Sequence, residues 1–258
     1  MQHIKYARRN LPMLECSVNL GIRILNVHFE TEKFYFAFEK IFLCTPPVKN
    51  PWFSIFIRKS KKIQSNIDIS KKLAELYYCN NKAFPFTKAV TSFFSYLLYT
   101  QDVLVFHASS VVKNDGAVLF CGEQGVGKTT VSVMSGLPRY SDDAAFIRKS
   151  GNTFLLYPTP FETSKIYARL RKPLKIRCLY FLHQGSRNIV NRMHPYESVI
   201  YASRNLFSNF LNVSNQAVQK ACYTLLSDFV GNVPMRQLYF NRDIGFLQSL
   251  LEKNEGKI

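Results

Sequence analysis

One stretch of this 258-residue sequence has the residue types and the spacing to bind phosphate. Residues 122–129 read Gly-Glu-Gln-Gly-Val-Gly-Lys-Thr and fit the pattern G-x-x-x-x-G-K-[ST] at every fixed position. The glycines let the backbone turn tightly and aim its N–H groups at phosphate oxygens, and a following helix presents its positive end to the same anion. In such a loop Lys128 reaches the β and γ phosphates, and the hydroxyl of Thr129 ligates Mg²⁺. The pattern therefore predicts binding of a nucleoside triphosphate such as ATP, together with Mg²⁺.

The sequence on either side of this loop supports the prediction. An apolar run at residues 117–121 reads as a strand that enters the loop, and residues 128–135 read as a short helix that leaves it. A glycine turn with an incidental lysine is the alternative, and this strand–loop–helix context argues against it. The residues that we expect to line the nucleotide site are Gly122, Gln124, Gly125, Val126, Gly127, Lys128, Thr129 and Thr130.

A histidine reaches the same neighbourhood through a predicted hairpin. Residues 114–116, Asn-Asp-Gly, are a strong tight-turn signal between two apolar runs. If the first two residues form the turn, the ladder sets His107 opposite Gly122; if the last two form it, His107 lies opposite Gln124. A lone histidine in a strand is more often structural, but both registers put this one beside the loop mouth. We therefore expect His107 to transfer a proton or to contact the γ-phosphate.

Two adjacent carboxylates, Asp142 and Asp143, follow the strand-like residues 139–141. In a βαβ unit this strand belongs to the same sheet as the loop strand, with its end near the phosphates. One carboxylate can then hold Mg²⁺, and the other can accept the proton of an attacking hydroxyl. A solvated Ser-Asp-Asp turn is the alternative, and the nearby phosphate loop favours the chemical role.

These segments together resemble a known family. The order His107-Ala-Ser-Ser-Val-Val, phosphate loop, Ser141-Asp142-Asp143 looks like the catalytic domain of HPr kinase/phosphorylase and its HPr-kinase-like relatives. The run at residues 173–182 belongs to the same resemblance, which covers roughly residues 90–245.

The resemblance implies a phosphotransferase with a phosphoenolpyruvate-carboxykinase-like P-loop core. In that family the histidine before the loop and the two aspartates carry the chemistry. Carried over, Asp142 is the base toward the acceptor hydroxyl, and Asp143 with Thr129 holds the metal; His107 and Lys128 complete the predicted catalytic set. The resemblance therefore implies a Mg²⁺-dependent, ATP-using kinase that phosphorylates a hydroxyl, most often Ser, of a small protein or peptide.

The sequence departs from the bifunctional members of that family in one segment. Their second signature, an Arg-Gly-Leu-Gly-type segment next to a glutamate, is not found, and residues 157–162 occupy the corresponding stretch. Glu162 is either a metal-side carboxylate or an ordinary surface residue. The departure puts phosphorylase activity, and HPr itself as the substrate, in doubt.

The chain is basic, with 34 Lys and Arg against 17 Asp and Glu and a net charge of +17. Charge alone bears on solubility and association, not on fold or reaction. A segment at residues 165–177 concentrates basic side chains with no acid among them: Lys165, Arg169, Arg171, Lys172, Lys175 and Arg177.

This basic segment has three interpretations. It is a solvated face, an anion-binding segment beside the aspartates that would also suit an acidic acceptor, or a nucleic-acid contact. A reading helix, an aromatic stacking motif and a zinc knuckle are all missing from the sequence, so we favour a protein or peptide acceptor over nucleic acid. The alternative function is a P-loop nucleotide-binding regulatory or nucleic-acid-associated protein without kinase activity.

The elements that must position these residues predict an α/β fold. We expect a β-rich N-terminal region at residues 1–86, with strands from the alternating residues 18–24 and from the aromatic runs 34–38 and 52–57. Residues 87–258 are predicted as the P-loop catalytic domain, a mixed sheet with helices on its faces. Its expected strands are 103–112, 117–121, 139–147, 153–157, 174–182 and 238–240, and its expected helices are 87–100, 128–135, 195–209, 214–229 and 244–253.

The remaining features concern location and assembly. Apolar runs stay shorter than the ~18–20 residues of a membrane-spanning helix, and no signal peptide is read at the basic start. The six cysteines are scattered through apolar surroundings and predict buried free thiols in a reducing compartment. We therefore expect a cytoplasmic protein without a membrane partner. The sequence does not decide whether the protein is an oligomer, since HPr-kinase relatives often form oligomers but no subunit interface can be recognised in these residues.

Overall fold

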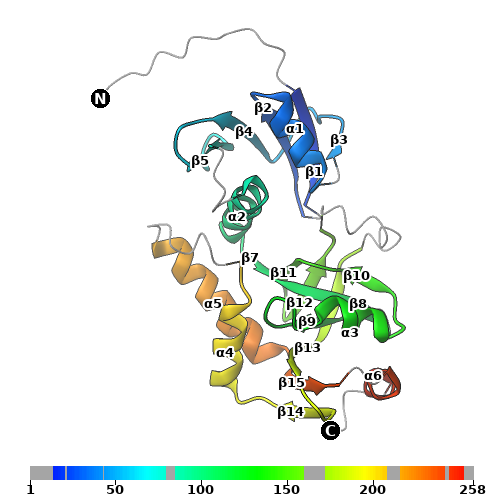
Figure 1. Ribbon diagram of the computed structural model, residues 1–258. Helices are drawn as coiled ribbons and strands as arrows, with labels where there is room; N and C mark the ends of the chain where they lie inside the picture. Colours follow the sequence, from blue (N-terminus) through cyan, green and yellow to red (C-terminus); the bar gives the residue numbers. More distant parts are fainter. Residues whose placement is uncertain are drawn as a thin grey trace.

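The computed structural model describes residues 14–20, 22–42, 44–79, 85–159, 172–207, 216–241 and 244–252. Within these ranges the chain forms six helices and two mixed sheets, which confirms the predicted α/β class (Figure 1).

The first sheet has six strands in the order β3-β1-β2-β4-β6-β5. Strands β2, β4 and β6 run parallel to one another, while β1 and β5 run antiparallel to their neighbours. Alternate residues of β4 are buried, as expected for a sheet with one face on the core. The strands are β1 (Leu14–Asn19), β2 (Ile24–Phe29), β3 (Cys44–Thr45), β4 (Phe53–Lys59), β5 (Gln64–Asp68) and β6 (Leu73–Tyr78).

Two N-terminal predictions are wrong in detail. The aromatic run 34–38 is part of helix α1 (Glu32–Glu39), not a strand. Thr31 caps the helix, and the helical spacing places Phe34 and Phe38 one turn apart, so that both are buried on the same side. The hydroxyl of Thr31 accepts a hydrogen bond from the N–H of Phe34 at 3.3 Å. The alternating residues 18–24 do not form one strand either. Strand β1 ends at Asn19 and β2 begins at Ile24, and Gly21 lies outside the described residues.

The second sheet has nine strands, with β10-β8-β9-β13-β12-β11-β7 in order, β15 beside β13, and β14 beside β15. Strands β9, β13 and β15 are parallel, so their carboxyl ends meet at one edge. The strands are β7 (Val103–Phe106), β8 (Ala108–Lys113), β9 (Gly116–Cys121), β10 (Arg139–Ser141), β11 (Ala145–Ser150), β12 (Thr153–Tyr157), β13 (Leu174–Gln184), β14 (Ile189–Arg192) and β15 (Met235–Phe240).

The strand predicted over residues 139–147 is interrupted. Strand β10 pairs with β8, whereas β11 pairs with β7 and β12, so the chain changes neighbours between Ser141 and Ala145. The chain bends at residues 142 and 143, so the two aspartates lie in the break between the strands.

Helix α2 (Phe86–Tyr99) lies between the two sheets in Figure 1 and joins their cores. Its residues Val90, Phe93 and Leu97 are fully buried in one hydrophobic cluster that contains side chains of both sheets. The division at residue 86 stays a prediction, because this core is continuous across it. The other helices are α3 (Lys128–Met134), α4 (Pro195–Arg204), α5 (Gln216–Asn232) and α6 (Ile244–Glu252).

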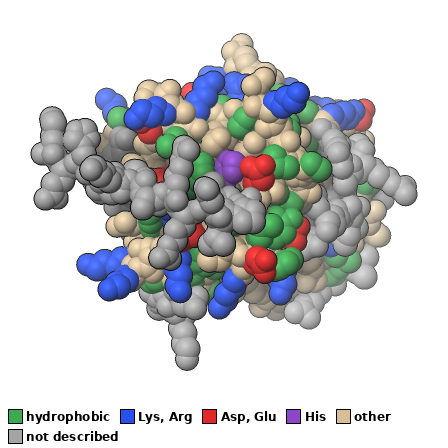
Figure 2. All heavy atoms as spheres, turned by 90° about the horizontal axis from the view of Figure 1, so that it is seen from above, with side chains coloured by type: hydrophobic (Ala, Val, Ile, Leu, Met, Phe, Trp, Pro, Cys, Tyr) green, Lys and Arg blue, Asp and Glu red, His purple; other side chains and the backbone are tan. Residues whose placement is uncertain are grey.

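On the face in Figure 2, Lys and Arg side chains stand mostly around the edge and do not gather in one patch. All six cysteines are thiols that form no disulfide, and Cys16 Sγ lies 3.3 Å from Cys44 Sγ as a thiol contact. Among the helices in the described part of the chain, none combines the length and the apolar character needed to cross a membrane.

Candidate phosphate-binding site

The predicted phosphate loop lies between strand β9 and helix α3, as the sequence pattern requires. Gly122, Gly125 and Gly127 have φ of 148°, 80° and 109°, a region that side-chain-bearing residues rarely adopt. Space is also tight at two of them, since a Cβ on Gly122 would lie 3.0 Å from Cγ1 of Val126 and a Cβ on Gly127 would lie 3.1 Å from Cζ of Phe240. The loop pattern therefore reflects backbone geometry and not only composition.

Lys128 lies across the mouth of this loop. Its ammonium Nζ donates to the carbonyl oxygens of Gly122 at 2.9 Å and Glu123 at 3.0 Å, and the side chain is buried. Burial lowers the pKa of Lys128, while the nearby Cys121 and Asp143 act in the opposite direction. The hydroxyl of Ser109 on β8 donates to the Lys128 carbonyl oxygen at 2.9 Å, which ties the start of α3 to the hairpin.

His107 immediately precedes the paired part of the hairpin. Lys113 pairs with Gly116 and Ala108 with Cys121, so the observed register is the one that sets His107 opposite Gly122. The imidazole packs edge-on against Phe207, with ring centroids 5.7 Å apart. Burial, followed by the charge of Lys128, lowers the pKa of His107, and Asp143 counteracts them. The ring is therefore neutral at neutral pH.

The structure separates the two adjacent aspartates. Asp143 is exposed and lines a cavity of about 600 Å³ together with His107, Lys128, Thr129 and Thr130. This cavity is the place where most of the predicted site residues meet.

Asp142 is not among the residues that line the cavity. Its Oδ2 lies 3.9 Å from Nη1 of Arg139, and its Oδ1 is buried without a hydrogen-bond partner in the described part of the chain. Strand β10, which leads into the aspartates, is fixed to β8 by a 2.6 Å hydrogen bond between the buried hydroxyls of Ser141 and Ser110. The geometry therefore favours Asp143 over Asp142 as the carboxylate that faces the phosphates.

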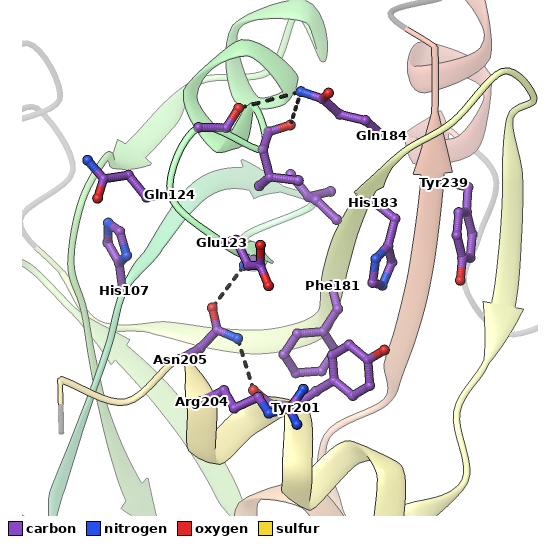
Figure 3. Close-up of a pocket in the computed structure, with 14 residues that line it drawn as sticks. His107, Glu123, Gln124, Phe181, His183, Gln184, Tyr201, Arg204, Asn205 and Tyr239 are labelled. Atoms are coloured by element: carbon purple, nitrogen blue, oxygen red, sulfur yellow. Dashed lines mark hydrogen bonds between the residues drawn. The ribbon is translucent and has the colours of Figure 1, made fainter.

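Asn205 is a site residue that the sequence does not reveal. It caps helix α4, where its Nδ2 donates to the carbonyl oxygen of Tyr201 at 2.9 Å. Its Oδ1 accepts from the N–H of Gly122 at 2.9 Å (Figure 3). Its backbone carbonyl oxygen accepts from the N–H of His107 at 2.8 Å. One residue at a helix end thus holds both the loop and the histidine strand. An asparagine at a helix end signals only a cap, so no local pattern marks this contact.

The basic segment is described only from Lys172 onward; Glu162, Lys165, Arg169 and Arg171 lie outside the described residues. Lys175 and Arg177 are exposed on β13, where Lys175 pairs with Gly116 at the start of β9. The phosphate loop follows the other end of β9. These two cations therefore lie away from the loop, at the hairpin turn, where Arg177 donates to the Asn114 carbonyl oxygen at 3.4 Å.

The described residues offer only some of the ligands that a bound cation needs. Within the described ranges, no group of three or more His, Cys, Asp or Glu side chains is placed to hold a metal ion. Thr129 and Asp143 line the same cavity. Two such oxygen donors fit Mg²⁺, which usually takes one or two protein ligands and completes its shell with water and phosphate oxygens.

Comparisons with known proteins leave the family open. No family model and no curated protein matches the chain. Among solved structures it is similar to the Hpr(Ser) kinase/phosphatase from Coxiella burnetii, with 12% identity over 57% of this chain and 91% of that chain, at a TM-score of 0.32. A TM-score this low carries no argument about activity, so the case for a function depends on the residues of the site.

Proposed function

We propose that the protein is a phosphotransferase that moves the γ-phosphoryl group of ATP to a hydroxyl, with Mg²⁺ and a phosphoenolpyruvate-carboxykinase-like P-loop core. The acceptor that we propose is a serine of a small protein or peptide. The observation that carries the proposal is the meeting of His107, Lys128, Thr129 and Asp143 around one cavity at a strand–loop–helix phosphate loop.

Each residue has a role that follows from its position. The loop N–H groups and the positive end of α3 bind the phosphate oxygens, and Lys128 stabilises the negative charge on the transferring group. Thr129 and Asp143 would hold Mg²⁺, which supplies charge neutralisation at the phosphates when bound. The binding half of the reaction thus needs only residues already gathered at the cavity.

Proton removal from the acceptor is assigned to His107. The acceptor oxygen forms a bond to the γ-phosphorus while the bond to the β–γ bridging oxygen breaks, ADP leaves, and the hydroxyl proton passes to the imidazole. A neutral imidazole can accept this proton, and the lowered pKa of His107 keeps it neutral. The resemblance assigns the same task to Asp142, and substitution separates the two assignments.

The test of the proposal combines binding and transfer. Calorimetry with Mg·ATP should show binding by the wild type and at least a hundredfold loss in Lys128→Ala. Transfer is followed as the gain of one phosphate, by mass spectrometry, on the product of a small open reading frame beside this gene or on seryl peptides. A folded wild-type protein that binds no ATP would sink the proposal.

Three variants then divide the chemistry. His107→Gln should abolish transfer and leave ATP affinity within about threefold. Asp143→Asn should weaken transfer and raise the Mg²⁺ concentration that transfer requires. If Asp142→Asn abolishes transfer with ATP binding intact while His107→Gln does not, the base is Asp142 as the resemblance implies.

The second candidate function is a nucleotide-regulated protein that binds nucleic acid, and the net charge of +17 favours it. It predicts binding to DNA or RNA whose affinity falls steeply with salt on a log–log plot. Flat or absent binding at low salt removes this candidate. Binding that responds to ATP, without any transfer, would instead support it.

A further inference from the structure

A second cavity, of about 770 Å³, lies on the other flank of the phosphate loop (Figure 3). It is bounded by the loop, by the carboxyl ends of β13 and β15, and by helix α4. His107, Gln124 and Gly125 line this cavity and also the cavity at Lys128, so the two adjoin across the loop. A ligand held at the loop by its phosphates can therefore extend into it.

The walls of this cavity carry several rings. His183 pairs with Tyr239 across β13 and β15, and their rings stack at 4.7 Å between centroids with 20° between planes. Tyr201 of α4 meets the His183 ring edge-on at 5.8 Å and lies 5.3 Å from the Phe181 ring. In Figure 3 the His183 ring lies on the cavity side of Tyr239. Open α/β sheets bind ligands at the carboxyl ends of their strands, which is where these rings stand.

His183 also offers an unused hydrogen-bonding atom. Its Nε2 is buried and has no hydrogen-bond partner within the described part of the chain. A polar atom of this kind costs free energy unless a partner satisfies it. A planar heterocycle can stack on the face of the imidazole, whereas a hydrogen bond to Nε2 lies in the plane of the ring and needs a second polar group of the same ligand at the ring edge.

We propose that this cavity binds the nucleobase of the phosphate donor. The inference depends on the proposed function, because the phosphate loop must hold the triphosphate of the same molecule. It favours a nucleoside triphosphate over pyrophosphate as the phosphate donor, because pyrophosphate carries no base. Stacking on the His183 ring would supply part of the affinity for the base.

The test compares two ligands that share a triphosphate and differ in the base. Calorimetry measures the Kd of ATP and of inorganic tripolyphosphate at equal Mg²⁺ for the wild type, His183→Ala and His183→Phe. Loss of one stacking partner should weaken ATP about tenfold in His183→Ala. Tripolyphosphate should change by less than about twofold, and His183→Phe should recover most of the ATP affinity because it keeps a ring.

A matched control comes from helix α4, which also carries Tyr201. Tyr196 on α4 is 62% exposed and is not among the residues that line the cavity, so Tyr196→Ala removes a surface ring without touching the base. It should leave both Kd values unchanged. Circular dichroism shows whether each variant is folded. If His183→Ala does not fold, the wild type alone decides, because it should bind ATP about tenfold more tightly than tripolyphosphate.

The outcomes are distinguishable from failure of the proposed function. Wild-type protein that binds neither ligand contradicts the phosphate site itself. Wild-type protein that binds both ligands equally, or a His183→Ala variant that loses both equally, overturns the base site alone. A variant that keeps its ATP affinity but needs more acceptor for transfer would assign the rings to the acceptor and would also overturn it.

Discussion

Replacement of Asn205 by alanine should loosen the phosphate loop, although Asn205 lies 83 residues after Gly122 in the sequence. The side chain makes two hydrogen bonds, one from Gly122 N–H to its Oδ1 and one from its Nδ2 to the Tyr201 carbonyl oxygen, each at 2.9 Å. A typical hydrogen bond contributes about 1 kcal/mol to stability, so loss of both should lower the free energy of unfolding by about 2 kcal/mol. Asn205 is buried, which makes replacement by water at both groups incomplete.

Of the two lost hydrogen bonds, the one to Gly122 should affect the binding of ATP. Gly122 is the first residue of the loop, and the hydrogen bond to Oδ1 of Asn205 fixes the orientation of its N–H. Without this acceptor the loop samples other conformations, and ATP must reorder it when it binds. About 1 kcal/mol of reordering corresponds to roughly a fivefold rise in Kd. Urea unfolding measures the first quantity, and calorimetry with Mg·ATP measures the second.

Asn232 supplies a matched control for the capping half of this contact. Its Nδ2 donates to the Asp228 carbonyl oxygen at 2.8 Å, four residues earlier on α5, as that of Asn205 does on α4. Asn232→Ala should lower stability slightly and leave the Kd of ATP unchanged. Equal Kd values for the Asn205→Ala and Asn232→Ala variants would refute the reasoning, because Asn205 would then act only as a helix cap.

Three further predictions concern single side chains. Transfer should be constant around neutral pH and fall only below pH 6.5, because the lowered pKa of His107 keeps it unprotonated at higher pH; a pH–rate profile with its acid limb at or above 6.5 would contradict this assignment. Gly127→Ala should lower the free energy of unfolding by about 1–3 kcal/mol, since φ is 109° and the new Cβ meets Phe240; Gly127→Ala with wild-type stability in urea would show that the loop can relax. Thr31→Ala should lower the free energy of unfolding in urea by about 1 kcal/mol, because helix α1 loses its N-cap hydrogen bond. An unchanged urea midpoint would mean that side-chain packing alone stabilises this helix.

The sequence predicts the phosphate loop well because its geometry is local. Positive φ angles at Gly122, Gly125 and Gly127 require glycine at fixed spacing, so the backbone requirement is written directly in the residues. The hairpin is local as well, and its turn at Asn114 and Asp115, with φ of 46° and 58°, sets the register that brings the histidine to the loop. Both features depend on neighbours within a few residues.

The features that could not be predicted depend on tertiary contacts or on competing local signals. Asn205 meets Gly122 across 83 residues of sequence, and neither residue carries a mark of the other. The aromatic run 34–38 has high strand propensity, yet the Thr31 cap and the burial of Phe34 and Phe38 on one side make it helical. Propensity and periodicity disagree in such a run, and only the packing partner decides between them.

The two aspartates illustrate a further limit of reasoning from neighbours in sequence. Successive side chains of an extended chain point to opposite sides, so two consecutive carboxylates need not face the same ligand. Here the chain leaves β10, which pairs with β8, and enters β11, which pairs with β7, and the pair lies on this step. Asp143 consequently reaches the cavity at Lys128, while Asp142 turns toward Arg139. Under the proposed function, Asp143 is therefore the carboxylate of the pair that can reach the phosphates, and the proton acceptor that we propose is His107, which lines the same cavity from the strand next to the loop.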